Sequence, residues 1–243
     1  MNIRTRGPYR KPTFWGKPPD GCGRDQALPG RGRIFGQAPL RAFGRHMVDA
    51  GHVAKDLEAV IHTEEQILAR VDTLAAELHE RYGDSTPIMV GVLGGAATFT
   101  VDLARAYPAQ AEIGWMAIKS YTTRNRASGS VRLLKDLEVD ISGRDVIIVD
   151  GVIDTGLTMS WLISNLAQRA PRSIAVCALL RKPDVARFDD TPTYIGFDVG
   201  PGLIVGYGLD YQGRYRNLRC TALIVENAMK PANGTRQPGP RPQ

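Results

Sequence analysis

A short apolar strand that ends in an acid and leads directly into a helix limits the architecture of this chain more than any other feature. Val146–Val149 is apolar, Asp150 follows it, and the loop Asp154–Thr158 opens a helix. Backbone N–H groups at a helix N-terminus bind anions, and a glycine such as Gly156 lets a phosphate approach the backbone. The stretch is neither a G-x-x-x-x-G-K-[ST] loop nor a G-x-G-x-x-G turn. It therefore predicts a phosphate site of another type, with an ordinary Asp or Thr helix cap as the alternative.

Strands and helices alternate along the chain around this stretch. Thr63 and Gln66 form a capping box for a helix that ends at Gly83. Apolar runs and helical periodicity predict strands over 88–93, 113–118, 145–150, 173–180, 194–197 and 203–207, and helices over 99–106 and 157–169. This alternation is typical of a parallel sheet with helices on both faces, whose ligands lie at the carboxyl ends of the strands. The polar residues 120–135 are expected to form a long loop of the kind that covers a binding site.

The positive charge of the chain is confined to its two ends. The net charge is +6, but residues 1–46 hold 10 basic and 2 acidic residues, and residues 230–243 hold 3 basic residues and no acid. The body from 47 to 229 therefore carries −5, so nucleic acid is not the expected partner of the folded part. Both ends are rich in Pro and Gly. This composition predicts a disordered basic extension over 1–50, a folded domain over 51–229 and a disordered basic tail over 230–243.

Composition also excludes several classes of protein. The three cysteines are scattered and form no C-x-x-C pair, so neither a disulfide framework nor a structural zinc site is expected. No apolar run is long enough to span a membrane, which takes roughly 18 residues. The N-terminus lacks the apolar segment of a secretory signal. We therefore expect a cytoplasmic protein without membrane contacts.

The 146–158 stretch resembles the phosphoribosyl-pyrophosphate motif of the type I phosphoribosyltransferases, and further motifs narrow this to the hypoxanthine-guanine phosphoribosyltransferases. The match covers roughly residues 55–225. In chain order the further motifs are Gly91-Val92-Leu93, Lys119-Ser120-Tyr121, Ser128-Gly129 with Leu134–Leu137, Leu180–Pro183, and Gly206–Tyr211 with Arg214–Leu218. The resemblance implies an α/β fold of the type I phosphoribosyltransferase kind. Such a fold has a mostly parallel sheet flanked by helices, a small hood and a flexible lid loop.

The resemblance also implies a reaction and its participants. A 6-oxopurine base, hypoxanthine or guanine, attacks the anomeric carbon of phosphoribosyl pyrophosphate. Pyrophosphate leaves with Mg²⁺ as the metal cofactor, and IMP or GMP forms, which is a purine salvage reaction. The protein must position the reactants, accept the purine proton and support the leaving group with positive charge. The family resemblance further implies a homo-oligomer, either a dimer or a tetramer.

Five side chains match family residues with chemical roles. Asp154 matches the general base that faces the purine N7, and Lys182 matches the lysine that donates to the purine O6. Asp150 matches an acid that holds the ribose hydroxyls and can bind the metal, and Asp210 matches a second magnesium-binding acid. Arg216 matches an arginine that supports pyrophosphate, a task suited to the guanidinium fork. For Asp154 the alternative is a plain helix cap, and for Lys182 it is a solvated lysine.

Other matches fall on the phosphate cradle, the pyrophosphate loop, the purine contacts and the lid of the family. These residues are, in that order, Thr155, Gly156, Leu157 and Thr158; Gly94 and Gly95; Leu203 and Ile204; and Ser120 and Tyr121.

Three positions depart from the family pattern. Asp150-Gly151 stands where two adjacent acids are usual, and the first acid is usually the longer Glu. Leu93-Gly94-Gly95 stands where Leu-Lys-Gly is usual, so a lysine side chain is missing. Leu203 replaces an aromatic residue that stacks on the purine, and leucine offers no π-stacking. The three departures affect three parts of one expected site.

Three readings of the function remain open at this point. The first is an active purine phosphoribosyltransferase, favoured by the presence of Asp154, Lys182, Asp210 and Arg216. The second is a non-catalytic nucleotide-binding or regulatory protein on the same fold, with the basic N-terminal segment as an interaction arm for RNA. The third is a phosphoribosyltransferase that acts on another base-like acceptor.

Overall fold

The computed structural model describes residues 53–121, 130–182, 191, 193–225 and 228. The predicted extension over 1–50 and the predicted tail over 230–243 lie outside these residues. None of the helices described is long and apolar enough to cross a membrane.

A six-stranded sheet forms the centre of the fold, in the order β4-β3-β2-β5-β6-β7. Its strands are β2 (Ile88–Leu93), β3 (Glu112–Tyr121), β4 (Ser130–Lys135), β5 (Asp145–Ile153), β6 (Ser173–Arg181) and β7 (Thr193–Asp198). All neighbouring strands are parallel except β4, which runs antiparallel to β3. The predicted α/β fold with a mostly parallel sheet is therefore confirmed.

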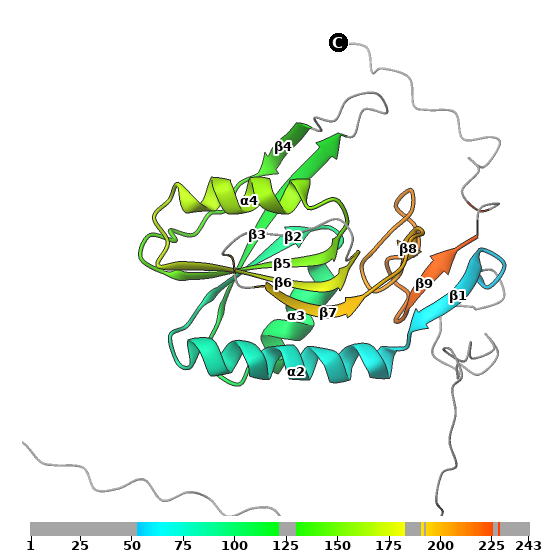
Figure 1. Ribbon diagram of the computed structural model, residues 1–243, viewed down its shortest axis with the longest axis horizontal. Helices are drawn as coiled ribbons and strands as arrows, with labels where there is room; N and C mark the ends of the chain where they lie inside the picture. Colours follow the sequence, from blue (N-terminus) through cyan, green and yellow to red (C-terminus); the bar gives the residue numbers. More distant parts are fainter. Residues whose placement is uncertain (1–52, 122–129, 183–190, 192, 226–227, 229–243) are drawn as a thin grey trace, which may run out of the picture. The chain divides into compact units, whose positions relative to one another are not determined.

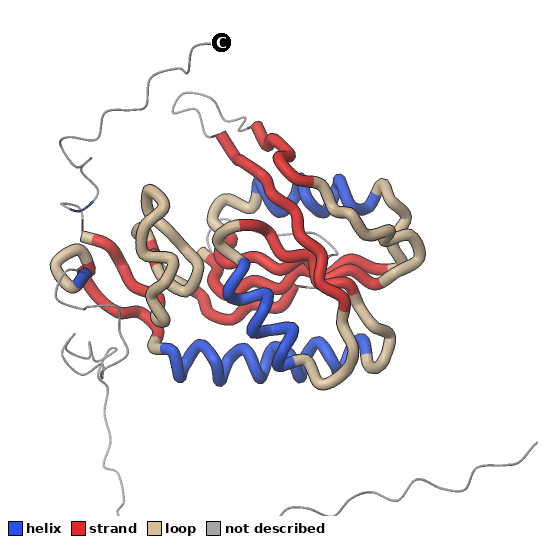
Figure 2. The backbone as a smooth tube through the Cα atoms, turned by 180° about the vertical axis from the view of Figure 1, so that it is seen from behind, coloured by secondary structure: helices blue, strands red, loops and turns tan. Residues whose placement is uncertain are grey.

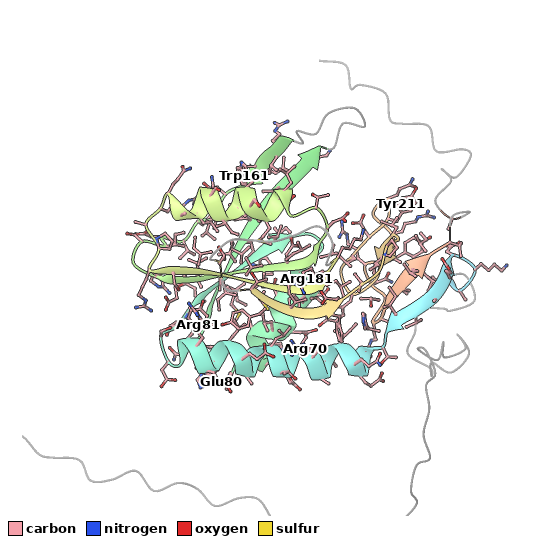
Figure 3. All side chains as sticks on the ribbon, viewed as in Figure 1. Arg70, Glu80, Arg81, Trp161, Arg181 and Tyr211 are labelled. Carbon is pink, nitrogen blue, oxygen red and sulfur yellow. The ribbon has the colours of Figure 1, made fainter. Side chains whose placement is uncertain are left out.

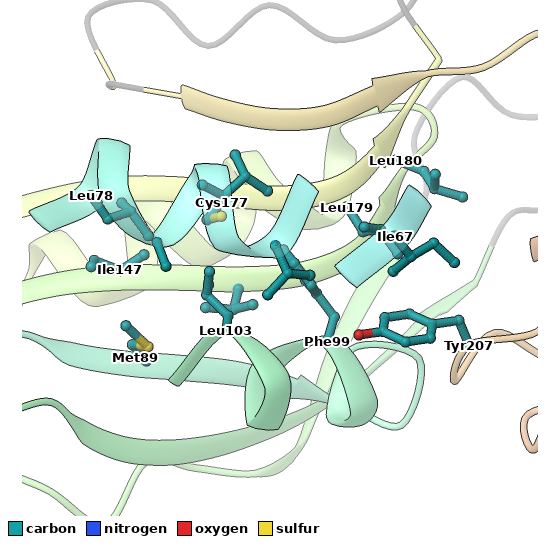
Figure 4. Packing of buried hydrophobic residues seen from close by; sticks show 14 of the residues in the cluster. Ile67, Leu78, Met89, Phe99, Leu103, Ile147, Cys177, Leu179, Leu180 and Tyr207 are labelled. Carbon is teal, nitrogen blue, oxygen red and sulfur yellow. The ribbon is translucent and has the colours of Figure 1, made fainter. Parts of the chain in front are cut away.

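Helices cover both faces of this sheet. The helices α2 (Glu64–Tyr82) and α3 (Ala97–Ala106) lie on one face and α4 (Leu157–Ala167) lies on the other (Figure 1). Successive residues of a strand point to opposite faces, so β5 contributes side chains to the hydrophobic cores on both faces of the sheet. Ile147 and Val149 join the core under α2 and α3, and Val146 and Ile148 join the core under α4. Figure 4 shows the first of these cores, with Phe99 of α3 at its centre.

Helix α2 begins and ends where its sequence predicts. The side chain of Thr63 accepts from the Gln66 N–H, and the Gln66 side chain accepts from the Thr63 N–H, which completes the capping box. Arg70, labelled in Figure 3, then ties the helix to the edge of the sheet. Its guanidinium donates to the carbonyl oxygens of Ile195 and Gly196 on β7, at 2.7 and 3.0 Å.

A second, three-stranded antiparallel sheet lies beyond the carboxyl ends of the central strands (Figures 1 and 2). It contains β1 (Leu57–His62), β9 (Thr221–Ile224) and β8 (Ile204–Val205), in the order β1-β9-β8. We call this sheet the hood, and residues 206–220, which connect β8 to β9, the hood loop. The strand predicted over 203–207 is only two residues long and belongs to this sheet. The sequence patterns did not predict β1 or β9.

The segment 120–135 is not simply the long loop that its polar residues suggest. Residues 120 and 121 are the end of β3, and residues 130–135 form β4, which pairs with β3 from Ala117 to Tyr121. The register places Ser120 opposite Val131 and Tyr121 opposite Ser130. Pairing across the hairpin supplies the backbone hydrogen bonds that a polar sequence does not predict. The part of the segment between the two strands lies outside the described residues.

Candidate functional site

The loop between β5 and α4 forms the floor of a cavity at the carboxyl edge of the sheet. The strand predicted to end at Asp150 continues to Ile153, because Val152 and Ile153 still pair with Leu180 and Arg181 of β6. The cavity has a volume of about 240 Å³, and its lining includes Asp150, Asp154, Thr155, Gly156, Thr158 and Met159. The structure thus brings together the acid and the loop that the sequence singled out.

The start of α4 leaves its backbone donors open to a ligand. Gly156 precedes the helix in the left-handed conformation, at φ 74°, which favours glycine. No side chain caps this helix end; Thr155 Oγ1 lies 3.5 Å from the Leu157 nitrogen, at the limit of a hydrogen bond. The first N–H groups of a helix have no intrahelical partner. The arrangement can therefore bind an anion such as a phosphate group.

Asp150 is a partly buried acid beside this anion site. Its Oδ1 accepts from the N–H of Gly151 at 2.7 Å. Burial raises the pKa of Asp150 to about 6, although the N–H groups of Gly151 and Val152 act in the opposite direction. A carboxylate held in this way can accept hydrogen bonds from sugar hydroxyls or bind a hard cation through its oxygens.

Asp154, which lines the cavity, forms an ion pair with Lys182. Lys182 Nζ lies 3.0 Å from Asp154 Oδ1. The lysine is anchored by its backbone, since its N–H donates to the carbonyl of Ile153 at 3.0 Å. The carboxylate follows β5 and the ammonium group follows β6, so the parallel pairing of these strands brings the two groups together. The side chain of Asp154 is 60% exposed, which leaves it accessible to a ligand.

The Gly94-Gly95 turn at the end of β2 is in close contact with two other glycine positions. A Cβ atom on Gly151 would lie 2.9 Å from the carbonyl oxygen of Gly95, and a Cβ on Gly208 would lie 2.5 Å from the same atom. Both distances are shorter than real Cβ contacts. The end of β5 and the hood loop therefore pack directly on the backbone of this turn. The close approach is a steric reason for the missing side chain at position 151.

The hood loop holds a second ion pair. Arg216 Nη2 lies 2.6 Å from Asp210 Oδ1, and Arg216 Nη1 donates to the carbonyl of Gly208 at 2.7 Å. The other oxygen of Asp210 accepts from the N–H of Gly213, also at 2.7 Å. Both charged groups are thus fixed by the backbone of the loop itself. Both side chains are partly exposed, so a charged ligand can reach them.

Tyr207 links the hood loop to the helix that follows the Gly94-Gly95 turn. Its hydroxyl donates to Asp102 Oδ2 on α3 at 2.5 Å, and its ring lies next to Phe99 (Figure 4). The pKa of Tyr207 is raised above its ordinary value, mainly by burial and to a smaller extent by the hydrogen bond to Asp102. The sequence predicted a role for neither Tyr207 nor Asp102. The two residues are 105 positions apart, and no local pattern relates them.

The two predicted purine contacts differ in their packing. Ile204 is buried in the core under α2 and α3, whereas Leu203 is partly buried and packs on the apolar centre of the hood. Ser120 and Tyr121 end β3, and the structure describes the positions of their backbones only. Their predicted lid role stays a prediction.

The carboxylates suit a cation that is shared with a ligand. Across the part of the chain that the structure describes, no group of three or more His, Cys, Asp or Glu side chains could hold a metal ion. Mg²⁺ is usually bound by one or two carboxylates together with substrate phosphates and water. Asp150 and Asp210 supply oxygen donors of this kind, so the residues present fit Mg²⁺ bound with a phosphate ligand.

Comparison with known proteins identifies the family. The model of the phosphoribosyl transferase domain matches residues 59–212. A hypoxanthine-guanine phosphoribosyltransferase of Mycobacterium avium is 47% identical over 169 residues, which cover 67% of this chain and 83% of the relative. That of Bacillus subtilis is 40% identical over 163 residues, covering 67% and 91%. A crystal structure of a Staphylococcus aureus hypoxanthine phosphoribosyltransferase superposes with a TM-score of 0.70 at 31% identity, over 74% of this chain and 98% of that one. The chain is therefore a transferase that belongs to the phosphoribosyltransferase family.

Proposed function

We propose that this protein transfers the phosphoribosyl group of phosphoribosyl pyrophosphate to hypoxanthine or guanine, forming IMP or GMP and pyrophosphate in purine salvage. The observation that carries the proposal is the Asp154–Lys182 ion pair, 3.0 Å apart, whose carboxylate lines the same cavity as an uncapped helix N-terminus. The Asp154 carboxylate can accept a proton and the Lys182 ammonium group can donate to an oxo group, and both act beside a phosphate site. The names of the relatives point to the same substrates.

The α4 end of the cavity is proposed to hold the ribose phosphate. The residues Thr155, Gly156, Leu157 and Thr158 offer backbone N–H groups and two hydroxyls to the phosphate oxygens. Asp150 then accepts from the ribose hydroxyls, which fixes the sugar at the carboxyl end of β5. This positioning presents the anomeric carbon to the base and converts a bimolecular encounter into a reaction within one complex.

The purine is proposed to bind between Asp154 and Lys182. Lys182 donates to the oxo group at C6, and Asp154 accepts the proton from N7 as the base bonds to the anomeric carbon. An amino group at C6, as in adenine, cannot accept from the ammonium group in this way. The pair therefore favours 6-oxopurines. Leu203 and the backbone of Ile204 are proposed to contact the ring.

Pyrophosphate is proposed to leave between the Gly94-Gly95 turn and the hood loop. Arg216 supplies positive charge there, and the turn supplies backbone N–H groups. Asp150 and Asp210 would hold Mg²⁺ together with the phosphate oxygens. Bound Mg²⁺ would neutralise charge that develops on the leaving pyrophosphate.

Four wider proposals rest on the resemblance and on composition. Residues 51–229 form the catalytic domain, between a disordered basic extension over 1–50 and a disordered basic tail over 230–243. The protein assembles as a homo-oligomer, either a dimer or a tetramer. Light scattering of the purified full chain measures its molar mass and so distinguishes the two. It acts in the cytoplasm, and Ser120 and Tyr121 belong to a lid over the reacting atoms.

A turnover assay with defined bases tests the proposed reaction. The purified chain is incubated with Mg²⁺, phosphoribosyl pyrophosphate and each of hypoxanthine, guanine, xanthine and adenine, and nucleotide formation is followed by chromatography. We expect product from hypoxanthine or guanine and none from adenine. Nucleotide binding without product would contradict the proposal and support a non-catalytic role. Product from a non-purine acceptor alone would support the third reading.

A further inference from the structure

Residues 198–204 run from the last residue of β7 to the first residue of β8 and carry both proposed ring contacts of the purine; we call them the purine segment. At its start, Asp198 accepts two hydrogen bonds from the Arg181 guanidinium, at 2.7 and 3.0 Å. At its end, Ile204 pairs with Leu223 of β9. The position of the segment is therefore set by two strands, β7 before it and β9 beside it.

His62, the last residue of β1, contacts both of these strands. Its ring is stacked on the ring of Phe197 in β7, with the centroids 4.0 Å apart and an angle of 22° between the planes. Its Nδ1 lies within hydrogen-bond distance of the Thr221 hydroxyl oxygen in β9, at 2.9 Å. Phe197 directly precedes the purine segment, and Thr221 lies two residues before Leu223, the partner of Ile204. One side chain thus bridges the two strands that set the segment.

The bridge formed by His62 is uncharged and closely packed. Burial lowers the pKa of His62 below its ordinary value, so the ring is neutral at pH 7. A neutral imidazole nitrogen can donate to a hydroxyl or accept from it. Thr221 is fully buried, and a buried hydroxyl that loses a partner costs free energy. The imidazole is therefore held by one contact on its face and another at its edge.

The ring contacts of the purine depend on this placement because their own side chains are already packed. Ile204 is buried in the core, and Leu203 packs on the apolar centre of the hood. Lys182, the proposed donor to the oxo group, directly follows Arg181, which holds Asp198. The base therefore meets groups whose positions follow the backbones of β6, β7 and β9.

We infer that His62 is a positioning residue for the purine: by bridging β7 and β9 it sets the place of the purine segment, and it acts on the affinity for the base without touching the base. This inference rests on the proposed function, because it assigns the segment to the purine of that reaction. The phosphate site is built from other elements, since the lining of its cavity comes from residues 150–159. Loss of the bridge should therefore weaken binding of the base and leave binding of phosphoribosyl pyrophosphate unchanged.

Steady-state kinetics of His62→Leu on the full chain test the inference. The KM for hypoxanthine should rise about fivefold or more, the effect of losing a ring stack and a hydrogen bond together. The KM for phosphoribosyl pyrophosphate and kcat should stay within about twofold of wild type, because the phosphate site and the proposed base Asp154 lie on other elements. An unchanged KM for hypoxanthine, or an equal rise in the KM for phosphoribosyl pyrophosphate, would overturn the inference.

His79→Leu is the matched control for loss of a packed histidine. His79 is also partly buried, and its ring packs on that of Tyr107 with the centroids 5.6 Å apart, at the amino ends of the strands. The variant makes the same chemical change far from the purine segment, so both KM values should equal those of wild type. A rise in the KM for hypoxanthine as large as that of His62→Leu would overturn the inference.

A double-mutant cycle tests whether His62 acts through Phe197. Phe197→Leu should raise the KM for hypoxanthine, and the double variant with His62→Leu should exceed the larger single effect by less than about twofold, because both changes remove the same contact. Fully additive losses would overturn the inference. His62→Phe keeps the stack and removes only the hydrogen bond to Thr221, so its KM should rise about threefold, less than that of His62→Leu. No rise in His62→Phe would overturn the bridge even if His62→Leu failed to fold.

Turnover of the wild-type chain distinguishes failure of the inference from failure of the proposed function. Absence of nucleotide from hypoxanthine and guanine would overturn the proposed function and the inference with it. Nucleotide formation by wild type, with an unchanged KM for hypoxanthine in His62→Leu, would overturn the inference alone.

Discussion

Asp154 and Lys182 neutralise each other as an ion pair, with Oδ1 and Nζ 3.0 Å apart. Asp154→Asn removes the group that is proposed to accept the purine proton. We expect kcat to fall about 10²- to 10⁴-fold, the usual contribution of general base catalysis. The melting temperature should change little, because an exposed ion pair contributes only about 0–1 kcal/mol.

Steady-state kinetics and a thermal melt of the Asp154→Asn variant measure both effects. Asp72→Asn is the matched control, since Asp72 is an exposed acid on α2, and its kcat should equal that of wild type. A kcat within a few-fold of wild type for Asp154→Asn would exclude the base role.

Asp150 gives the activity a pH dependence. Burial raises its pKa to about 6, and its ionised form is the one proposed to bind the ribose hydroxyls and the metal. We expect kcat/KM for phosphoribosyl pyrophosphate to fall as the pH drops from 7 to 5, with an apparent pKa near 6. Initial rates across this range measure the profile, and a flat profile would contradict the assignment.

The raised pKa of Asp150 also makes folding stability depend on pH. As the pH rises, its contribution to stability falls, whereas the activity is expected to increase. The raised pKa means that the folded chain holds this proton more tightly than the unfolded chain, whose Asp has an ordinary pKa near 3.8. Its stabilising contribution is complete below about pH 4 and is lost as the pH rises through about 6, by at most about 3 kcal/mol. Denaturant unfolding of wild type and Asp150→Asn at pH 4.5 and 7 should show the variant gaining relative stability at pH 7. A difference that does not depend on pH would contradict the raised pKa of Asp150.

Gly151→Asp restores the acid that the family usually has, but the structure predicts no gain. The new Cβ would lie 2.9 Å from the Gly95 carbonyl oxygen and 3.0 Å from Leu209 Cδ2. We expect a loss of about 1–3 kcal/mol in the free energy of unfolding, typical of overpacking, and a higher KM for phosphoribosyl pyrophosphate. Gly200→Asp, at an open position, should change neither quantity. A rise in kcat/KM for Gly151→Asp would show that the missing acid limits catalysis.

Tyr207→Phe tests whether the hood loop must be tied to α3. The variant leaves Asp102 without its 2.5 Å partner, which should cost about 1–3 kcal/mol of stability. Because Tyr207 sits between Gly206 and Gly208, the KM for phosphoribosyl pyrophosphate should rise while kcat changes less.

Tyr107→Phe provides the comparison for Tyr207→Phe. Its hydroxyl donates to the Gly83 carbonyl at 2.9 Å, at the amino ends of the strands. It should lose stability without a change in KM. Equal changes in KM for the two variants would reduce Tyr207 to a purely structural residue.

Leu203→Phe supplies the missing aromatic surface. Stacking is worth about 0.5–1.5 kcal/mol, so the KM for hypoxanthine should fall about two- to tenfold. Leu134→Phe, on an exposed position of β4, should leave the KM unchanged. An unchanged KM for Leu203→Phe would place the base away from residue 203.

Local patterns predicted the parts of the fold that local chemistry determines. The capping box at Thr63 predicted the start of α2, and the apolar runs predicted the positions of β2, β5 and β6 to within a few residues. The two-residue strand β8 and the hairpin partner β4 owe their conformation to pairing with distant residues, which a sequence window does not contain.

The candidate site shows the same division between local and distant contacts. The sequence singled out the Asp150–Thr158 stretch because strand, acid and helix start are contiguous there. At positions 94 and 151 the sequence showed only that side chains usual in the family are absent. At position 151 the reason for the absence is a contact with a residue far along the chain, the Gly95 carbonyl, whereas a Cβ at position 94 would make only ordinary contacts with Arg216.

The carbonyl oxygen of Gly95 limits the side chains that two distant positions can carry. The end of β5 and the hood loop both rest on it, so the sizes of residues 151 and 208 are constrained by one shared volume. Single substitutions of Gly151 or Gly208 should therefore each destabilise the protein. The turn after β2 thus sets a common limit, and a side chain can enter at position 151 or at position 208 only when the Gly95 carbonyl shifts away from that segment.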